Sequence, residues 1–451
     1  MAHALFSPSS AHKWTRCEGA LAMEYGYPDS TSAAADEGTA AHHLAALVLT
    51  DGTYYTRAYQ GRIIRVVNGV VYERGDPWPP LFKGQRNRSD RTFEVDEDMC
   101  DAVQTYVDAI RGRIDEYKAA GAVDTTILVE NRVDISNVVN YPEQFGTSDI
   151  IIIATWADGT SLIGVEDLKY GYRLVNAERN EQLMIYALGA LEQYEMLGNF
   201  TRARMVIHQP NRDHVSDWEC SVDELREFGD KAKKAAGRAL SAYENAVRTK
   251  TEPSVALLTP GEKQCQWCKR KGDCPALVGF VEEVTGVEFE DLTKEKIEEL
   301  TTEPVVIEDP EAYGERLAKL RAAVPLLDIF ARGILAMSDA FVLGGGKMPG
   351  WKAVQGKKGN RRWDDANAAE EEMKRMRLSS DDMYTKKVIS PTQAEKLLAK
   401  DSPRRWKKLN SLVTQSEGQP AVVEESDKRP PLEIKNPEDD FAAVIDGDDM
   451  V

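Results

Sequence analysis

The chain has 451 residues, of which 42% are hydrophobic and 8% aromatic, as is typical of a folded protein with a sizeable core. This length allows two or three domains. No apolar run approaches the length of a membrane span, and the first residues lack the charged and apolar segments of a secretion signal, so we expect a cytoplasmic protein with no membrane partner. Three of the six cysteines are crowded into residues 264–274, which indicates a metal site rather than a disulfide framework.

The formal net charge of −18 argues against a nucleic-acid partner, but the charge is unevenly distributed. Residues 424–451 contain ten acidic and three basic side chains, a net charge of −7. Prolines interrupt this stretch, so we expect a disordered acidic tail over 416–451. The tail either solvates the chain or acts as a partner-docking or DNA-mimicking segment, since Phe441 and Ile445 lie among the acids.

The hydrophobic pattern predicts helices and strands in an order typical of an α/β fold. Helices are expected at 7–26, from Asp36 to about 49, 96–120, 176–196 and 222–247. Strands are expected at 126–135, 147–156, 161–169 and 202–210, with shorter strands and loops in an insertion at 51–92. The Asp-Gly pair within 157–160 predicts a hairpin. A central mixed sheet flanked by helices fits this order.

Beyond residue 290 the composition becomes helical and charged. A helix is expected over 309–340, followed by a glycine-rich break at 343–350. We therefore divide the chain into a sheet-containing domain at 1–290, a mostly helical, basic region at 291–415 and the acidic tail at 416–451.

The stretch "GVEDLKYG" contains the strongest chemical signal. Asp167 and Lys169 are two apart on a strand and so share one face. Asp149 begins the preceding strand, and the hairpin brings it close to Asp167. Two carboxylates and a lysine at one strand end suit a phosphodiester hydrolase that uses Mg²⁺ or Mn²⁺. A single D-x-K triplet is common on solvated strands, so this interpretation depends on neighbouring residues.

Those neighbours come from three other segments. Glu130 lies in the strand before Asp149, and "GTAAHH" places His42 or His43 near a helix start. Gln182 and Tyr186 are four apart and share a helix face. Each of these residues alone would be read as an ordinary packing or surface residue.

In this order, the residues closely resemble the RecB-like branch of the PD-(D/E)XK nuclease superfamily over about residues 1–280. The matching motifs are the opening "FSPSSAHKWTRCEGA", G-T-x-x-H at Gly38–His42, the aspartate of "GTSD", D-x-K-x-G at Asp167–Gly171 and Q-x3-Y at Gln182–Tyr186. The resemblance implies a restriction-endonuclease-like core and a DNA nuclease, with exonuclease as the expected mode.

The same resemblance implies a role for each matching residue. His42, Asp149 and Asp167 would bind the Mg²⁺ or Mn²⁺ ion, with the Leu168 carbonyl as a further ligand. Lys169 would be the catalytic lysine. Gln182 and Tyr186 would contact substrate or support the site. Glu166 is adjacent to Asp167 but lacks the two-residue spacing to Lys169, so we expect it to face the opposite side.

The run "QCQWCKRKGDC" leaves a possible metal site one ligand short. RecB-like nucleases with an iron–sulfur staple, such as CRISPR-adaptation nucleases and AddB-type subunits, place one cysteine before the nuclease motifs and three after them. This resemblance implies that Cys17, Cys265, Cys268 and Cys274 hold a structural [4Fe–4S] cluster. Zinc is the main alternative, because zinc sites with four cysteines are common. We expect Cys100 and Cys220 to be ordinary buried thiols.

Two stretches of the C-terminal third, 350–363 and 402–409, interleave basic residues with tryptophans. This pattern is typical of nucleic-acid binding, although a solvated basic face gives the same pattern. The candidate nucleic-acid contacts are Lys357, Lys358, Arg361, Arg362, Arg404 and Arg405. The "GWK…GNRRW" pattern and "SDKRPPL" resemble the end of a phage and prophage nuclease family of unestablished function.

The phage resemblance implies a replication or recombination module in the host cytoplasm. DNA would be the substrate, and a single-strand DNA-binding or other replication protein would be a possible partner. Two alternatives remain. One is a catalytically silent DNA-binding or scaffold protein that retains the nuclease fold, and the other is a zinc-stapled interaction module.

Overall fold

The computed structural model describes residues 4–27, 31–72, 89–286, 310–349, 351, 375, 395, 399 and 403–410. The chain divides into two compact units, Met1–Val354 and Gln355–Val451. Helix α15 (Pro403–Asn410) belongs to the second unit, and the other elements named below belong to the first. None of the helices in the described segments is both long and apolar enough to cross a bilayer.

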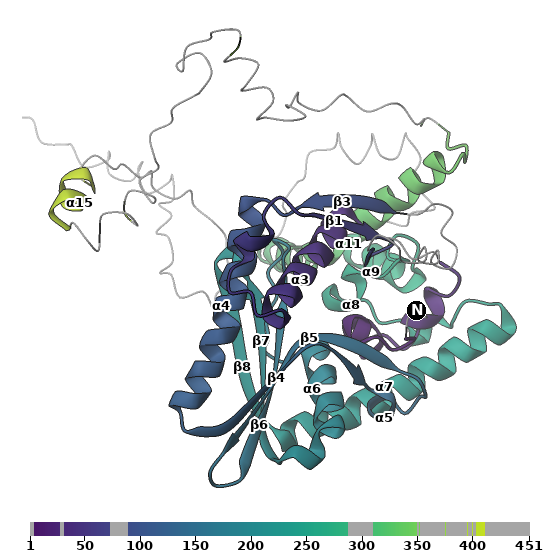
Figure 1. Cartoon of the computed structure of the whole chain (residues 1–451). Coiled ribbons are helices and arrows are strands. Elements are labelled where there is room, and N and C mark those ends of the chain that lie inside the picture. Colours follow the sequence, from purple (N-terminus) through teal and green to yellow (C-terminus); the bar gives the residue numbers. More distant parts are fainter. Residues whose placement is uncertain are drawn as a thin grey trace, which may run out of the picture. The chain divides into compact units, whose positions relative to one another are not determined.

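A mixed five-stranded sheet lies at the centre of the first unit (Figure 1). Its strands, in spatial order, are β4 (Ala122–Asp134), β5 (Phe145–Trp156), β6 (Thr160–Leu168), β7 (Asn199–Gln209) and β8 (His214–Ser221). Neighbouring strands are antiparallel except β6 and β7, which are parallel and joined through a helix. The predicted α/β class with a central mixed sheet and the predicted β5–β6 hairpin are both confirmed.

Strand β8 was not expected from the sequence. Its residues "HVSDWECS" include few apolar side chains, and the strand lies at the edge of the sheet, where most of its residues are exposed or half-buried. An edge strand packs few side chains, so its hydrophobic pattern is weak.

Both faces of the sheet are covered by helices. The run Ile150–Ile153 shows this most clearly, because alternate side chains enter two different cores. Ile151 and Ile153 pack with helices α6 (Glu181–Gln193) and α7 (Val222–Thr249). Ile150 and Ile152 pack with α3 (Ala33–Thr50) and α4 (Glu97–Ala119).

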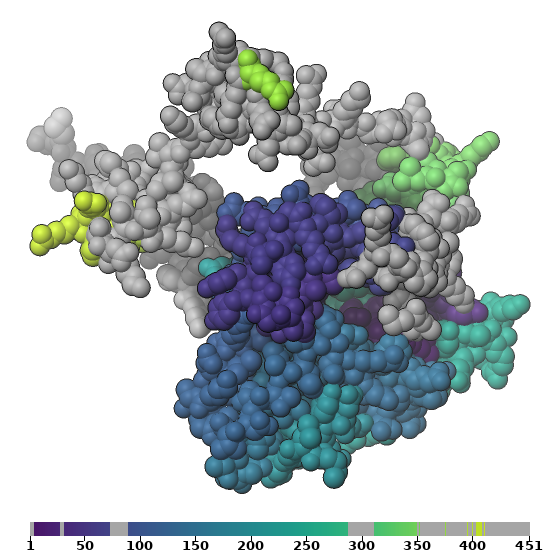
Figure 2. Space-filling view, in the orientation of Figure 1, coloured from purple at the N-terminus to yellow at the C-terminus, as the bar shows by residue number. Residues whose placement is uncertain are grey.

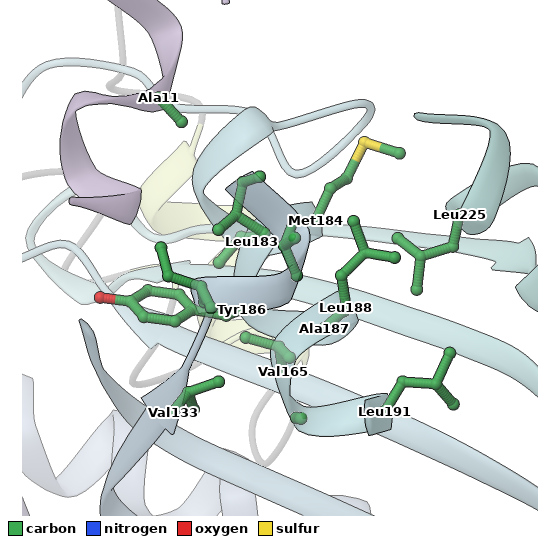
Figure 3. Close-up of a cluster of buried hydrophobic side chains, with 14 of the residues drawn as sticks. Ala11, Val133, Val165, Leu183, Met184, Tyr186, Ala187, Leu188, Leu191 and Leu225 are labelled. Carbon is green, nitrogen blue, oxygen red and sulfur yellow. The ribbon is translucent and has the colours of Figure 1, made fainter. Parts of the chain in front are cut away.

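The close-up of the first core shows how α6 is fixed to the sheet. Leu183, Leu188 and Leu191 lie among strand side chains such as Val133 and Val165 (Figure 3). Helix α6 begins at Glu181 because the side chain of Asn180 accepts hydrogen bonds from the first backbone N–H groups. The predicted helix start at 176 is therefore wrong, and residues 170–180 form a loop instead.

A small three-stranded sheet lies in the insertion between α3 and α4. Its order is β2 (Val70–Val71), β1 (Ile63–Val67) and β3 (Asp90–Glu94). Figure 2 shows the purple α3 segment lying against the blue surface of the central region. The insertion thus has the short strands that the sequence predicts, and it contributes to the core that holds α3 in place.

The predicted helix over 7–26 is broken into three short pieces. These are η1 (Pro8–Ser10), α1 (Ala11–Trp14) and α2 (Ala20–Met23). The break occurs because Gly19 approaches another segment closely: its N–H donates to the Leu257 carbonyl at 2.8 Å, and a Cβ there would lie 2.4 Å from the Leu258 side chain. Cys17 lies at this break, beside the later segment.

The end of the first unit is helical. The long α11 (Pro310–Leu343) packs Leu326, Ile329 and Phe330 against Leu277 and Val281 of α9 (Pro275–Thr285). This packing carries the compact unit beyond the boundary that we expected near residue 290, to Val354. The expected tail at 416–451 lies outside the described residues. The remaining short elements are η2 (Thr56–Tyr59), α5 (Ser136–Val139), η3 (Glu195–Leu197), η4 (Pro210–Arg212), η5 (Val255–Leu257) and α8 (Glu262–Gln266).

Candidate active site

The adjoining ends of β5 and β6 hold the two predicted aspartates. Antiparallel pairing places Ile150 opposite Glu166, so Asp149 lies beside the last residues of β6. The Asp149 Oδ2 atom accepts a hydrogen bond of 2.8 Å from the backbone N–H of Leu168. The Leu168 side chain is fully buried in the α3–α4 core. Its carbonyl as a metal ligand stays a prediction.

Glu166 and Asp167 face opposite sides of the sheet, as strand alternation requires. Glu166 is fully buried, with its carboxylate 3.1 Å from Arg113 Nε and 2.6 Å from His208 Nε2. Asp167 is 4% exposed and lies on the α6 side of the sheet, where it contacts Lys169 and Gln182. Asp167 therefore belongs to the candidate site, and Glu166 to a buried charge network behind it.

Lys169 and Gln182 bind Asp167 together. The Lys169 Nζ atom lies 2.8 Å from Asp167 Oδ2 and 3.3 Å from Gln182 Oε1. The Gln182 Nε2 atom donates to Asp167 Oδ1 at 3.1 Å. Burial lowers the pKa of Lys169, but the carboxylates of Asp167 and Asp149 outweigh burial and raise it. The lysine is therefore held as a cation next to Asp167.

His42 and Glu130 complete the site from α3 and β4. The His42 Nδ1 atom lies 3.1 Å from Asp149 Oδ1. One ligand atom each from His42, Glu130 and Asp149 lie within 4.8 Å of one another, and within the described segments this is the only such trio of histidine, cysteine or acidic side chains.

Glu130 is a ligand candidate that the predicted set lacks. It lies directly across the sheet from Asp149, because the residues on either side of it pair with Ile150 and Ser148. Its φ of +47° places it in the left-handed region, at the point where the ladder is interrupted. The antiparallel register of the two predicted strands is the signal that would have found it.

The charges of the site shift one another's pKa values. Burial would lower the pKa of His42, but the Asp149 carboxylate raises it to about 9. Burial would raise the pKa of Asp149, but His42 and Lys169 hold it below its ordinary value. Burial, and then the Asp149 charge, raises the pKa of Glu130 to about 7. For Asp167, burial outweighs the nearby Lys169 and raises the pKa. Such opposed shifts among neighbouring groups are characteristic of functional sites.

The donor set fits a divalent ion such as Mg²⁺ or Mn²⁺. Carboxylate oxygens are preferred by both ions, and an imidazole nitrogen is a ligand that Mn²⁺ also accepts. The three ligand atoms of His42, Glu130 and Asp149 lie close enough together to bind one ion. Asp167 lies next to Asp149, at the end of the neighbouring strand β6, and is bound to Lys169.

Tyr186 supports the site through packing. It is 6% exposed, and a Cβ on Gly146 would lie 2.7 Å from both its ring and the Pro8 side chain. The opening segment, the start of β5 and α6 therefore meet at one point, where only glycine fits. The pKa of Tyr186 is raised, first by burial and then by the charge of Asp167. The opening segment, the "GTSD" motif and the Q-x3-Y motif are therefore in direct contact around Gly146.

The N-terminal segment lies against the segment with three cysteines, near α8 (Figure 1). The Cys17 Sγ atom accepts a hydrogen bond of 3.5 Å from the Thr259 N–H, and Cys265 Sγ accepts one of 3.4 Å from Gly261. The Glu24 carboxylate binds Lys13 at 2.7 Å and the Lys269 N–H at 2.9 Å. The Cys17–Thr259 and Glu24–Lys269 contacts join segments more than two hundred residues apart.

The four predicted cluster cysteines are partly or fully buried. Burial raises the pKa of Cys17, brings that of Cys265 to about 11 and that of Cys268 to about 12. The charge of Cys274 raises the pKa of Cys17 and Cys265 further, so these thiols lie within electrostatic range of one another. Within the described residues, however, no three cysteine sulfurs lie mutually within 4.8 Å.

This spacing bears on the metal. Sulfurs around a single tetrahedral zinc ion, with Zn–S of 2.3 Å, would be about 3.8 Å apart. No three of the described cysteine sulfurs meet this spacing.

The basic candidates of the C-terminal third are only partly described. Arg404 and Arg405 are exposed on α15, and the following Trp406 is half-buried. Lys357, Lys358, Arg361 and Arg362 lie outside the described residues, so their role stays a prediction.

The fold and site define an α/β protein with a histidine–carboxylate group at one end of its central sheet. A family model described as "Protein of unknown function (DUF2800)" matches residues 3–430. The chain therefore belongs to the DUF2800 family. The match covers the sheet, the candidate site and all four cluster cysteines.

Proposed function

We propose that this protein is a metal-dependent DNA nuclease. The observation that supports this most directly is the convergence of Asp149, Asp167 and Lys169 at the adjoining ends of β5 and β6. His42 reaches the same point from α3. The order and spacing of these residues resemble the RecB-like nucleases, which adds weight that the geometry alone does not have.

In this proposal, His42, Asp149 and Glu130 hold a Mg²⁺ or Mn²⁺ ion together with Asp167. A divalent ion bound there would polarise the scissile phosphate and lower the pKa of an attacking water. Lys169 is kept protonated by Asp167, and its ammonium group stabilises negative charge that develops on the phosphate. Gln182 holds both side chains in place through its two amide atoms.

We further propose that the four cysteines hold a structural [4Fe–4S] cluster. The contacts of Cys17 with the segment at 257–259 support this, as does the resemblance of the cysteine order to nucleases with an iron–sulfur staple. The cluster would fix the N-terminal segment to the end of the nuclease core. Zinc in the same site is the competing identity, and metal analysis with a visible spectrum of anaerobically purified protein distinguishes the two.

The substrate we propose is DNA, degraded from its ends, within a phage replication or recombination module. A single-strand DNA-binding or other replication protein is the partner class that such a role implies. This part of the proposal depends on the resemblance alone.

The test is a digestion assay on the full chain with its cluster intact. Linear duplex, covalently closed circular, single-stranded and branched DNA are incubated with Mg²⁺ or Mn²⁺, beside an Asp167→Asn variant. We expect degradation of linear DNA, sparing of the closed circle and no activity in the variant. Failure to degrade any of these substrates would overturn the proposal. Cleavage of the closed circle would change the mode from exonuclease to endonuclease.

A further inference from the structure

The loop that follows the catalytic lysine is held in one conformation by side chains from the end of β7. Gln209, which is fully buried, and its neighbours Asn211 and Arg212 bind successive backbone groups of residues 170–175. The donor–acceptor distances are 2.7 Å to the Tyr170 carbonyl, 3.2 Å to Gly171, 2.6 Å to Tyr172, 2.7 Å to Arg173 and 2.8 Å from the Val175 N–H. Five hydrogen bonds therefore fix six residues of an exposed loop.

This fixed loop presents an aromatic ring to solvent. Tyr172 is 72% exposed and the following Leu174 is 50% exposed. A loop that has its backbone groups satisfied loses little further entropy when its side chains bind a ligand. A large exposed ring on such a loop is thus well suited to binding, and packing does not account for its position.

A second exposed ring comes from the cysteine segment. Trp267 is 60% exposed, and the guanidinium of Arg173 lies 5.7 Å from its ring centroid. Arg173 also lines a pocket of about 180 Å³ together with Lys271, Arg332, Glu262 and Asp328. Arg332 is paired with Asp328 at 3.0 Å, and the remaining pocket charges are two cations and one acid. The surface beside the two rings therefore has a small excess of positive charge.

We propose that Tyr172, Arg173 and Trp267 form a binding strip for a single-stranded nucleic-acid segment whose phosphodiester bond lies at Lys169. This inference rests on the proposed nuclease function and specifies its substrate: a frayed or single-stranded end. The aromatic rings stack on bases, and the cations bind phosphates.

The geometry agrees with that occupant. Tyr172 follows Lys169 by three residues, which span at most about 11 Å. This is about the length of three stacked nucleotides at 3.4 Å each. A base on Tyr172 would therefore lie within a few nucleotides of the bond at the catalytic lysine. Stacking accepts any base, so the strip binds without sequence preference.

Binding is measured on the full-length, cluster-loaded protein carrying Asp167→Asn. The probes are a fluorescein-labelled 20-nucleotide single strand and the same sequence as a blunt duplex, followed by fluorescence anisotropy. Tyr172→Ala and Trp267→Ala should each weaken single-strand binding by about 5- to 100-fold, the range expected for loss of one stacked base. Tyr172→Phe, which keeps the ring, should restore affinity to within about twofold.

Tyr55→Ala is the matched control, because Tyr55 is also a 62% exposed tyrosine but lies outside the strip. Its single-strand affinity should equal that of the parent protein. Arg173→Ala should reduce the slope of log affinity against log salt concentration by about 1, as expected for the loss of one phosphate contact. Metal content and circular dichroism of each variant establish that the cysteine site and the fold are intact.

The outcomes separate this inference from the proposed function. Unchanged single-strand binding in folded Tyr172→Ala overturns the strip, even if the wild-type protein degrades DNA. Loss of self-association in place of loss of DNA binding also overturns it and assigns the surface to a second copy of the chain. Single-strand binding that depends on Tyr172, in a wild-type protein that cleaves no DNA, supports the strip and overturns the nuclease.

Discussion

The two candidate metal sites of this protein are built in different ways. The carboxylate site is assembled by strand register: Asp149 and Asp167 lie on paired strands of one hairpin. Its acids also have cationic partners, with His42 3.1 Å from Asp149 and Lys169 2.8 Å from Asp167. The cysteine site is assembled by docking a segment near residue 17 onto one near 260.

This difference determines what each site needs in order to exist. The sheet and the ion pairs hold the carboxylates in place, so removing a metal should leave that region folded. Burial raises the pKa of Cys17, Cys265 and Cys268, and it outweighs the nearby Lys271 at Cys265 and Lys13 at Cys268. They become thiolates when a metal binds, so metal binding at the cysteines is coupled to folding. Loss of metal should therefore abolish activity at the carboxylate site without unfolding it, and should destabilise the fold around the cysteine site.

The largest effect is expected from adjacent residues on opposite faces of β6. Asp167→Asn removes a proposed metal ligand and the partner of Lys169, and should reduce the proposed nuclease activity by at least about 100-fold. Because Lys169 stays partly accessible to water, the unfolding midpoint should change little. The measurements are the initial rate on linear DNA and thermal unfolding.

Glu166→Gln is the matched change on the other face. It should remove the carboxylate that binds His208 and Arg113, although Arg113 keeps Glu116 and Asp217, and reduce the free energy of unfolding by about 1–3 kcal/mol. If Asp167→Asn unfolded the protein and Glu166→Gln abolished only activity, the assignment of the two faces would be reversed.

The cysteine site provides the next test. Cys17→Ala and Cys268→Ala should both cause loss of the metal and destabilise the protein to the same degree. Cys17 is 248 positions before Cys265 (265 − 17), so opening a loop of this length frees chain entropy on the order of 5 kcal/mol. Iron and zinc content and denaturant unfolding are the measurements.

Cys100→Ala is the control. Cys100 is fully buried in the α3–α4 core, where its Sγ contacts the Thr56 carbonyl. Its substitution should retain the metal and cost about 1 kcal/mol of stability. Equal metal loss in all three variants would show that the site is not specific to the four predicted cysteines.

Features that depend on local sequence patterns could be predicted from the sequence. Strand alternation is local, so Asp167 and Lys169 could be placed on one face and Glu166 on the other from spacing alone. The long helices α4 and α7 were also predictable, because each has a regular apolar face.

Features set by long-range packing were less predictable. The break in the expected first helix arises from the contact of Gly19 with Leu257 and Leu258. The inclusion of α11 in the first unit depends on the fit of Gly333 against Gly272, where added Cβ atoms would lie 2.5–2.6 Å from the facing backbone. Neither contact has a local pattern. Glu130 was missed as a ligand because its position depends on the register between two strands.

The pH dependence of metal binding should differ between the sites. The pKa of His42 is about 9, raised by Asp149 against the effect of burial, so a proton competes with metal at neutral pH. Mn²⁺ affinity should therefore increase as pH rises from 7 towards 9, by about tenfold per unit. Titration calorimetry in two buffers with different ionisation enthalpies measures the released proton.

His42→Gln should remove most of this slope, because its amide has no competing proton in that range. The cysteine metal should stay bound throughout the titration, as its release would require protonation of thiolates already held by the metal. A slope that persisted unchanged in His42→Gln would assign the proton to another group.

The smallest expected effect tests whether Glu130 belongs to the carboxylate site. Burial and Asp149 raise the pKa of Glu130 to about 7, so ionising it in the folded protein costs free energy, and that cost grows as pH rises from about 4.5 through 7. Glu130→Gln removes this cost and should raise the unfolding midpoint of metal-free protein at pH 8. The same change removes a ligand and should weaken Mn²⁺ binding a few-fold, roughly 3- to 10-fold. A residue with only a structural role would not shift stability and metal affinity in opposite directions. If both quantities fell together, Glu130 would be part of the strand packing and not of the metal site.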